Sequence, residues 1–173
     1  DFSKVFSATI SLLIASGCFG SQESDMAEQQ QTFHIENIYL NRSEFESPHP
    51  FHRTDKEWHP TADLKLHVIT SKQQEDQFDV AIQITVDVTM DKKKVYKVHV
   101  NQGGTFTIKG YTDDEVNHLT ESFCASILYP YARQKISDMV TSAGFPPLYL
   151  SPIDFETRYR EMQANIETEK SAK

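Results

Sequence analysis

The chain has 173 residues, of which 38% are hydrophobic and 24% are charged, and its formal net charge is −8. This size suits one compact domain, and no apolar run reaches the roughly 20 residues that a membrane-spanning helix needs. An acidic chain disfavours nucleic acid and anionic membrane as partners, and its two cysteines, Cys18 and Cys124, exclude a disulfide framework.

The first 32 residues precede the part of the chain that is expected to fold. Residues 4–20 place one lysine before an apolar run that ends in small residues around a cysteine, which is the layout of a bacterial export leader. Residues 21–32 are polar and without periodicity, so they are expected to be disordered. Without residues 1–25, 16 bases and 22 acids remain, a net charge of −6, with a single cysteine. Such a composition is typical of a reduced, cytoplasmic domain.

Alternating apolar residues predict the strands of a sheet. From Phe78 to Met90 every second residue is apolar, so this run is expected to form a long strand with one dry face and one wet face. The same alternation occurs in residues 62–68 and 96–100. The sequence MDKKK, at residues 90–94, predicts a hairpin turn between the last two of these runs.

The first and last strands are less regular. Residues 33–45 change their apolar phase, and a bulge near Glu36–Asn37 would reconcile the two halves of this strand. Gly103–Gly104 is expected to interrupt the last strand before its apolar residues resume at Phe106. The sequence therefore predicts four strands in succession.

Helical periodicity follows. Thr112–Glu115 has the form of a capping box, and apolar residues continue at helical spacing to Ile127. Pro130 is expected to break or kink this helix, because proline lacks an amide proton and crowds the preceding turn. The sequence AGFPP, with Gly144, ends the helical pattern. A last helix is expected after Asp154, followed by a disordered tail over residues 167–173.

Four strands followed by helices predict an α+β fold, in which a four-stranded antiparallel sheet is packed on one face by the helix around Pro130. The opposite face would be left to water or to a partner, and it would carry Asp79, Gln83, Asp87 and Lys97. The free edges of so small a sheet favour oligomerisation.

The sequence contains no pattern typical of a catalytic site. His49, His52 and His59 lie in one loop but lack the spacing of metal ligands. Cys124 has no neighbouring base that would activate a thiol, and the glycine pair at 103–104 lacks the rest of a phosphate-binding loop. We therefore expect no catalytic residue, no metal site and no cofactor.

Apolar residues in irregular segments are the unusual feature. Trp58 follows a loop rich in charge and proline, and a second group of rings lies near the helix ends, formed by Tyr129, Tyr131, Phe145 and Tyr149. Such rings either plug the ends of a sheet or line a groove that accepts apolar segments of other chains.

Three strings carry a resemblance to a known family: QGGTFTIKG at 102–110, ILYPYAR at 127–133 and GFPPLYLSPIDF at 144–155. Together with FHIENIYL, FESP and KEWHP in the N-terminal half, and from about Phe33 to Met162, the chain resembles the SecB family of protein-export chaperones. Members of this family begin with a short polar tail, so the resemblance implies that translation starts at Met26 and that residues 1–25 lie upstream of the true start.

The resemblance implies a four-stranded sheet with two helices, assembled as a dimer-of-dimers tetramer, with no nucleotide, metal or cofactor. It implies an ATP-independent chaperone that keeps unfolded precursor proteins translocation-competent and delivers them to the SecA motor. Contact between dimers through the proline-containing helix would place at the tetramer interface Ile127, Tyr131, Ile136 and Val140.

By the same resemblance, client segments would bind a hydrophobic groove between the second strand and the helix ends, lined by Tyr39, Phe45, Trp58, Leu64 and Leu66. SecA would dock on the wet face of the sheet through acidic residues, here Glu44 and Glu46. Arg42 stands where the family has an acid, His99 replaces a glutamate and Lys97 replaces an aliphatic residue, so motor docking is less secure than client holding.

Two alternatives remain open. A SecB-like chaperone of a toxin–antitoxin pair would have the same fold and a different client. A small-ligand-binding α+β protein would have a narrow, closed pocket under the sheet rather than an open groove.

Overall fold

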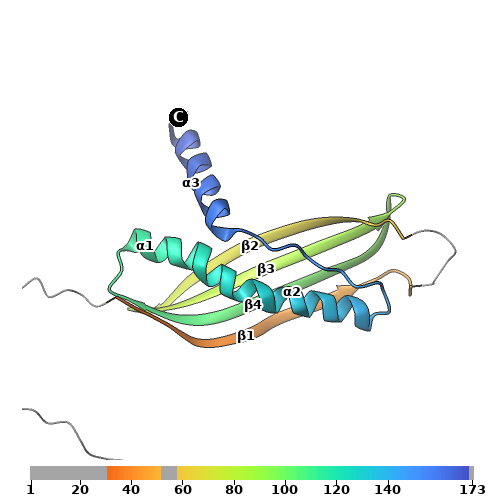
Figure 1. Ribbon diagram of the computed structural model, residues 1–173, viewed down its shortest axis with the longest axis horizontal. Coiled ribbons are helices and arrows are strands. Elements are labelled where there is room, and N and C mark those ends of the chain that lie inside the picture. Colours follow the sequence, from red (N-terminus) through yellow and green to blue (C-terminus); the bar gives the residue numbers. More distant parts are fainter. Residues whose placement is uncertain (1–30, 52–57, 172–173) are drawn as a thin grey trace, which may run out of the picture.

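The computed structural model describes residues 31–51 and 58–171. Four antiparallel strands form one sheet in the order β1-β4-β3-β2, and helices cover one face of it (Figure 1). The strands are β1 (Thr32–Glu46), β2 (Thr61–Gln74), β3 (Gln77–Met90) and β4 (Lys93–Lys109). This confirms the α+β fold with a sheet packed on one face. The predicted leader lies outside the described residues.

The alternation read from the sequence holds in the central strands. Along β3, Phe78 and every second residue after it up to Val88 are buried beneath the helices, and the residues between them face the opposite side. The turn between β3 and β4 consists of Asp91 and Lys92, whose φ angles are 52° and 63°. Two consecutive positive φ values are typical of the two-residue hairpin turn whose twist matches that of the strands.

β1 and β4 differ from expectation in part. The register of β1 shifts between Ile35 and Asn37, so the predicted bulge is confirmed, and a second shift falls between Leu40 and Arg42. β4 runs without interruption through Gly103–Gly104, so the expected break there is wrong. Glycine fits at both positions because neighbouring side chains occupy the space that a Cβ atom would need, on the helix-free face at Gly103 and on the helix-covered face at Gly104.

Gly104 lets the covering helix approach the sheet closely. A Cβ atom at Gly104 would lie 3.0 Å from Cδ2 of Leu128, which is itself fully buried. Contacts this short would force the helix or a side chain to shift. The glycine therefore sets the distance between β4 and the helix above it.

Three consecutive helical stretches form the layer over the sheet: α1 (Asp113–His118), the π-helical turn η1 (Leu119–Cys124) and α2 (Ala125–Ser142). Thr112 caps α1 with the predicted capping box. α2 continues through Pro130, so a break of the helix there is wrong. The widened turn instead lies earlier, at η1, which ends at Cys124, before α2 begins.

Gly144 ends α2 with φ 83°. Phe145 N–H donates to the carbonyl of Val140 at 3.2 Å, and Gly144 N–H donates to that of Thr141 at 2.9 Å. This is the Schellman arrangement, and it turns Phe145 back toward the sheet. The predicted stop of the helix is thus confirmed.

α3 (Phe155–Ser171) leaves the body of the molecule at an angle (Figure 1). It is helical to Ser171, so the expectation of a disordered tail from residue 167 is wrong for most of that segment. Among the helices that the structure describes, none is long and apolar enough to cross a membrane.

Candidate functional site

An aromatic cluster occupies one end of the sheet and consists of Phe45, Phe51, Trp58, Tyr96 and Phe145. Phe145 is at its centre, with ring centroids 4.9 Å from Tyr96, 5.3 Å from Phe51, 5.8 Å from Phe45 and 6.3 Å from Trp58. Phe145 and Tyr96 are buried, whereas the other three rings are only partly buried. The cluster therefore presents aromatic area at the surface on a rigid base.

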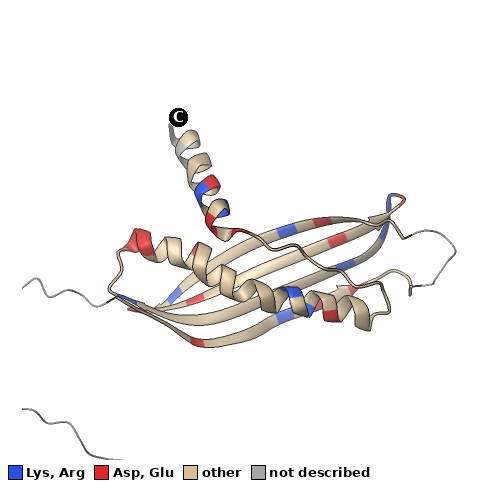
Figure 2. Cartoon of the chain, in the orientation of Figure 1, with Lys and Arg blue, Asp and Glu red and all other residues tan. Residues whose placement is uncertain are grey.

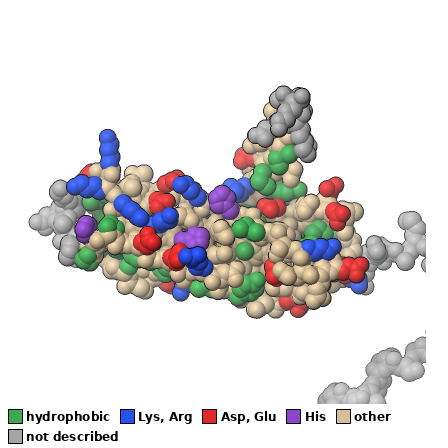
Figure 3. All heavy atoms as spheres, turned by 180° about the vertical axis from the view of Figure 1, so that it is seen from behind, with side chains coloured by type: hydrophobic (Ala, Val, Ile, Leu, Met, Phe, Trp, Pro, Cys, Tyr) green, Lys and Arg blue, Asp and Glu red, His purple; other side chains and the backbone are tan. Residues whose placement is uncertain are grey.

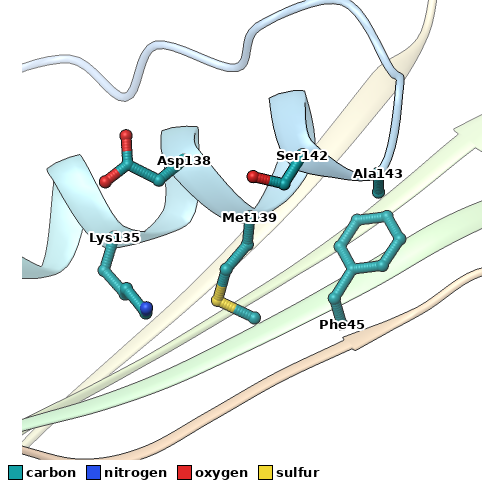
Figure 4. Close-up of a pocket in the computed structure, with 6 residues that line it drawn as sticks. All are labelled: Phe45, Lys135, Asp138, Met139, Ser142 and Ala143. Atoms are coloured by element: carbon teal, nitrogen blue, oxygen red, sulfur yellow. The ribbon is translucent and has the colours of Figure 1, made fainter.

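A pocket of 340 Å³ opens beside the aromatic cluster. Figure 4 shows Phe45 on β1 facing the C-terminal end of α2, which contributes Lys135, Asp138, Met139, Ser142 and Ala143. Phe45 thus belongs both to the pocket and to the cluster. The lining of the pocket combines the apolar side chains of Phe45, Met139 and Ala143 with polar side chains from the outer side of α2.

The five residues predicted to line one groove do not converge. Phe45 and Trp58 meet in the aromatic cluster. Leu64 and Leu66 lie on the helix-covered face of β2, at the opposite edge of the sheet; Leu64 is 37% exposed and Leu66 is buried. Tyr39 lies on the helix-free face, because it pairs with Gly103, and its ring covers that glycine.

The helix-free face of the sheet is polar (Figure 3). It has a hollow of 230 Å³ that is lined by Arg42, Glu44, Glu46, Thr85, Lys97 and His99. Both predicted docking acids, Glu44 and Glu46, lie in this hollow, beside the basic residues Arg42, Lys97 and His99. Alternation along each strand places these side chains on the same face of the sheet. The register between β1 and β4 then sets Glu44 opposite His99 and Glu46 opposite Lys97.

Of the four residues predicted at a subunit interface, Ile136 and Val140 are fully buried against the sheet within the chain. They have no exposed area to offer a partner and belong to the core instead. Ile127 is partly buried and Tyr131 is 53% exposed. Phe123, one helical turn before Ile127, is 48% exposed.

An exposed apolar patch therefore follows the outer side of the helical layer and the neighbouring strand. It consists of the exposed Ile35, Leu40, Phe123 and Tyr131, together with the partly buried Ile127. Phe33 ties the strand to the helix, because its ring centroid lies 5.1 Å from that of Phe123. Exposed patches of large apolar residues mark surfaces that bind other proteins.

α3 is attached to the body through its first two turns. Glu156 Oε2 lies 2.6 Å from His118 Nε2, and Arg158 Nη2 donates to the carbonyl of Leu66 at 3.0 Å. The hydrogen bond from His118 is the main cause that lowers the pKa of Glu156, and Arg160 adds to it. Phe155 packs edge-on against Tyr129 at 5.5 Å.

The structure offers little for nucleophilic chemistry at Cys124. Its thiol is fully buried, and this burial raises its pKa to about 12. A thiol with such a pKa is protonated near neutral pH, and the thiolate is the reactive form. Cys124 therefore packs as a small apolar residue on the buried side of η1, at the end of that turn.

Three contributors to these surfaces were not predicted from the sequence: Phe51, Met139 and Arg158. Phe51 lies in a loop, where no periodicity marks a contact. Met139 shares a helical pattern with buried residues, and only its packing shows that it faces a pocket. Arg158 reaches Leu66 across 92 residues of sequence, so no local signal could have identified the contact.

Comparison with known proteins places these features in context. Residues 26–166 match the family model described as "Preprotein translocase subunit SecB". A relative from Methylococcus capsulatus named "Protein-export protein SecB" is 36% identical over 82% of this chain and 90% of its own length. A second protein of that name, from Nitrosococcus oceani, is 34% identical over 83% of this chain and 88% of its own length.

The fold also resembles a solved structure. It is the SecB-like chaperone Rv1957 from Mycobacterium tuberculosis, in complex with a peptide from the HigA1 antitoxin, and it superimposes with a TM-score of 0.60 at 20% identity. The match covers 74% of this chain and 93% of that chain. At this identity the likeness concerns the fold.

Proposed function

The chain belongs to the SecB family of protein-export chaperones, and on this basis we propose that it holds unfolded precursor proteins on exposed aromatic surfaces, without ATP, and delivers them to the SecA motor. It is a protein-export chaperone; the holding surface, the motor and the assembly are what we propose. We further propose that it works in the cytoplasm and uses no catalytic residue, metal or cofactor.

The aromatic cluster and its adjoining pocket carry the holding proposal. Phe51 and Trp58 expose part of their rings on top of the buried Phe145, so a client side chain meets a surface that is already in place. Apolar contact is not directional and scales with the area removed from water. Such a surface binds many sequences weakly, which is what a chaperone of diverse clients needs.

Leu64, which is 37% exposed and lies two residues from the buried Leu66, supports a second apolar site on β2, and we propose that it continues the client path on the helix-covered side. Tyr39 would contact a different ligand from these residues, because it lies on the other face of the sheet. Clients would thus touch two sites on one chain, one at each edge of the sheet.

The exposed apolar patch supports assembly into a homotetramer, a dimer of dimers. Ile127 and Tyr131 would lie in its interface, together with Phe123 and the exposed residues of β1. A client that spans several copies gains effective concentration at each successive site, so weak sites add up to firm holding.

The hollow on the helix-free face supports docking of SecA. Glu44 and Glu46 are the residues we propose for this contact, and both are at its surface. The relatives at 36% and 34% identity are named as export proteins, whereas the antitoxin-bound chaperone shares only the fold. We therefore favour precursor export over service to an antitoxin.

Suppression of aggregation tests the holding proposal. The purified protein should keep a slow-folding precursor soluble in the absence of ATP. Trp58→Ala should weaken this activity several-fold, because it removes exposed area from the aromatic cluster, while Ile69→Ala should leave it unchanged. Ile69 is the control, since it is 47% exposed and pairs with Ala81 on the helix-free face of the sheet, away from the aromatic cluster.

Lack of suppression by the wild-type protein at several-fold molar excess would overturn the holding proposal. Equal activity of the Trp58→Ala and wild-type proteins would instead move the client site away from the aromatic cluster. A circular dichroism spectrum of each variant shows whether the fold is retained.

A further inference from the structure

We infer that the hollow on the helix-free face accepts an acidic side chain, carried by a partner segment that is otherwise basic. The inference deepens the proposed docking of the export motor and rests on that part of the proposed function. It assigns to Lys97 the role of choosing among docking partners.

The hollow's acids are already engaged by cations of the same chain. Arg42 pairs with Glu44 two residues along β1, and Lys94 Nζ lies 3.6 Å from Glu46 Oε2. His99 Nδ1 lies 2.9 Å from Thr85 Oγ1, so the ring is held at the floor of the hollow. Binding of a purely basic segment would therefore compete with two existing ion pairs.

Lys97 is the cation that remains. It lies between Glu46 and Asp87 in the strand register, yet among the residues that the structure describes it forms no ion pair or hydrogen bond. Lys97 thus lines the hollow and carries an ammonium group that none of the described residues binds. A carboxylate entering the hollow would gain a charge-assisted hydrogen bond there.

Charge balance restricts the rest of the partner segment. The chain as a whole carries −8, so a segment that is acidic throughout would be repelled. Near the hollow, positive and negative charges are equal in number. The bases are Arg42, Lys65, Lys94 and Lys97, and the acids are Glu44, Glu46, Asp63 and Asp87. A segment with one carboxylate among basic residues suits both: the carboxylate complements Lys97 in the hollow, and the basic residues complement the net negative charge of the chain.

This pattern differs from that of a docking face built from acids alone. An acidic face attracts any basic segment through long-range charge, with little selection. A hollow with paired acids and one unpaired cation requires a charge of the correct sign at the correct position. Misplaced like charges are costly, so the hollow discriminates between partners.

Two peptides test the inference. One is lysine-rich with a single central glutamate, and the other has glutamine in its place. The wild-type protein should bind the glutamate peptide on the order of tenfold more tightly by fluorescence anisotropy, which corresponds to about 1.4 kcal/mol. Lys97→Gln should abolish this preference, and Lys97→Glu should reverse it.

Lys109→Glu is the matched control. Lys109 lies on the same strand and the same face as Lys97, near its other end, and pairs with Asp76 outside the hollow. This variant has the same net charge as Lys97→Glu, so it should keep the preference for glutamate if position decides.

Equal binding of both peptides by the wild-type protein, failure to bind either, or a preference that survives in Lys97→Gln would each overturn the inference. Suppression of precursor aggregation is measured on the same variants. It should be unchanged, because Lys97 lies on the helix-free face of the sheet whereas the aromatic cluster lies on the helix-covered face, so the holding function can stand while the docking inference fails.

Discussion

The ring of Tyr39 lies directly over Gly103 on the neighbouring strand, where a Cβ atom would come within 2.7 Å of ring atom Cε2. The contact joins β1 to β4 on the helix-free face. Gly103→Ala should therefore displace the ring and lower the free energy of unfolding by about 1–3 kcal/mol, the usual effect of overpacking. Urea denaturation measures this loss.

A double-mutant cycle identifies the cause. Tyr39→Ala removes the ring, so adding Gly103→Ala to it should have a much smaller effect than Gly103→Ala alone. Equal effects in the two backgrounds would mean that the alanine acts through the backbone or through Asn41, whose Nδ2 would lie 2.8 Å from the same Cβ atom, and not through the tyrosine.

Gly144 positions the centre of the aromatic cluster. Its φ of 83° suits glycine, and a Cβ atom there would meet nothing within 4 Å. Gly144→Ala should cost about 1–2 kcal/mol of stability through backbone strain alone. Gly144→Asn should cost less, since asparagine tolerates this conformation. Equal losses in thermal unfolding of the two variants would contradict the backbone explanation.

The Cys124 thiol should resist modification in the folded protein. Burial holds its pKa near 12, so little thiolate exists at pH 8. Iodoacetamide should label Cys124 only after denaturation, as peptide mass spectrometry would show. Rapid labelling of this residue in the native protein would mean that η1 opens frequently.

Assembly should depend on Tyr131. A charge at this exposed position would be buried without a partner in the proposed interface. Tyr131→Asp should shift the protein to smaller species in analytical ultracentrifugation, whereas Tyr149→Asp should not. Retention of the wild-type sedimentation by Tyr131→Asp would exclude this helix face from the interface.

The pKa of Glu156 should respond to His118. The hydrogen bond between them lowers the pKa of Glu156 below its ordinary value of 4.5, so the contact stabilises the fold above that range and is lost as pH falls through the lowered value. His118→Ala should raise the pKa, and Arg160→Ala should raise it less, because His118 is the larger cause. Carbon-detected NMR titration measures both shifts.

A reversed order of the two variants would assign the main contact to Arg160. In that case the lowered pKa of Glu156 would reflect mainly the bond to Arg160 within α3, and not the contact with α1.

The sheet and its two faces could be predicted because alternation is a local property. Phe78 to Met90 shows its buried face in sequence, and the Thr112 capping box and the Gly144 stop are signalled by neighbouring residues. The continuity of α2 at Pro130 could not be predicted, since packing of Leu128 and Ile136 on the sheet outweighs the local preference of proline.

The groove residues illustrate a second limit. Tyr39 and Phe45 are six residues apart, which with strict alternation places them on the same face. The register shift between Leu40 and Arg42 puts them on opposite faces. Bulges arise from pairing with another strand, so one strand's sequence does not reveal how many it has.

Leu64 and Phe45 fail to meet for a different reason. Both are on the helix-covered face, but two strands separate them, and strand order is a long-range property. The sequence shows which residues are apolar, while their exposure and their distribution over the sheet required the topology.

The strand order has a further consequence for the aromatic cluster. Because β1 and β2 follow one another in the chain yet form opposite borders of the sheet, the connection between them must travel about 14 Å across the end of the sheet. Phe51 and Trp58 belong to this connection, and both contact Phe145. A rewired chain in which these two strands were adjacent would keep the same core and lose the exposed rings.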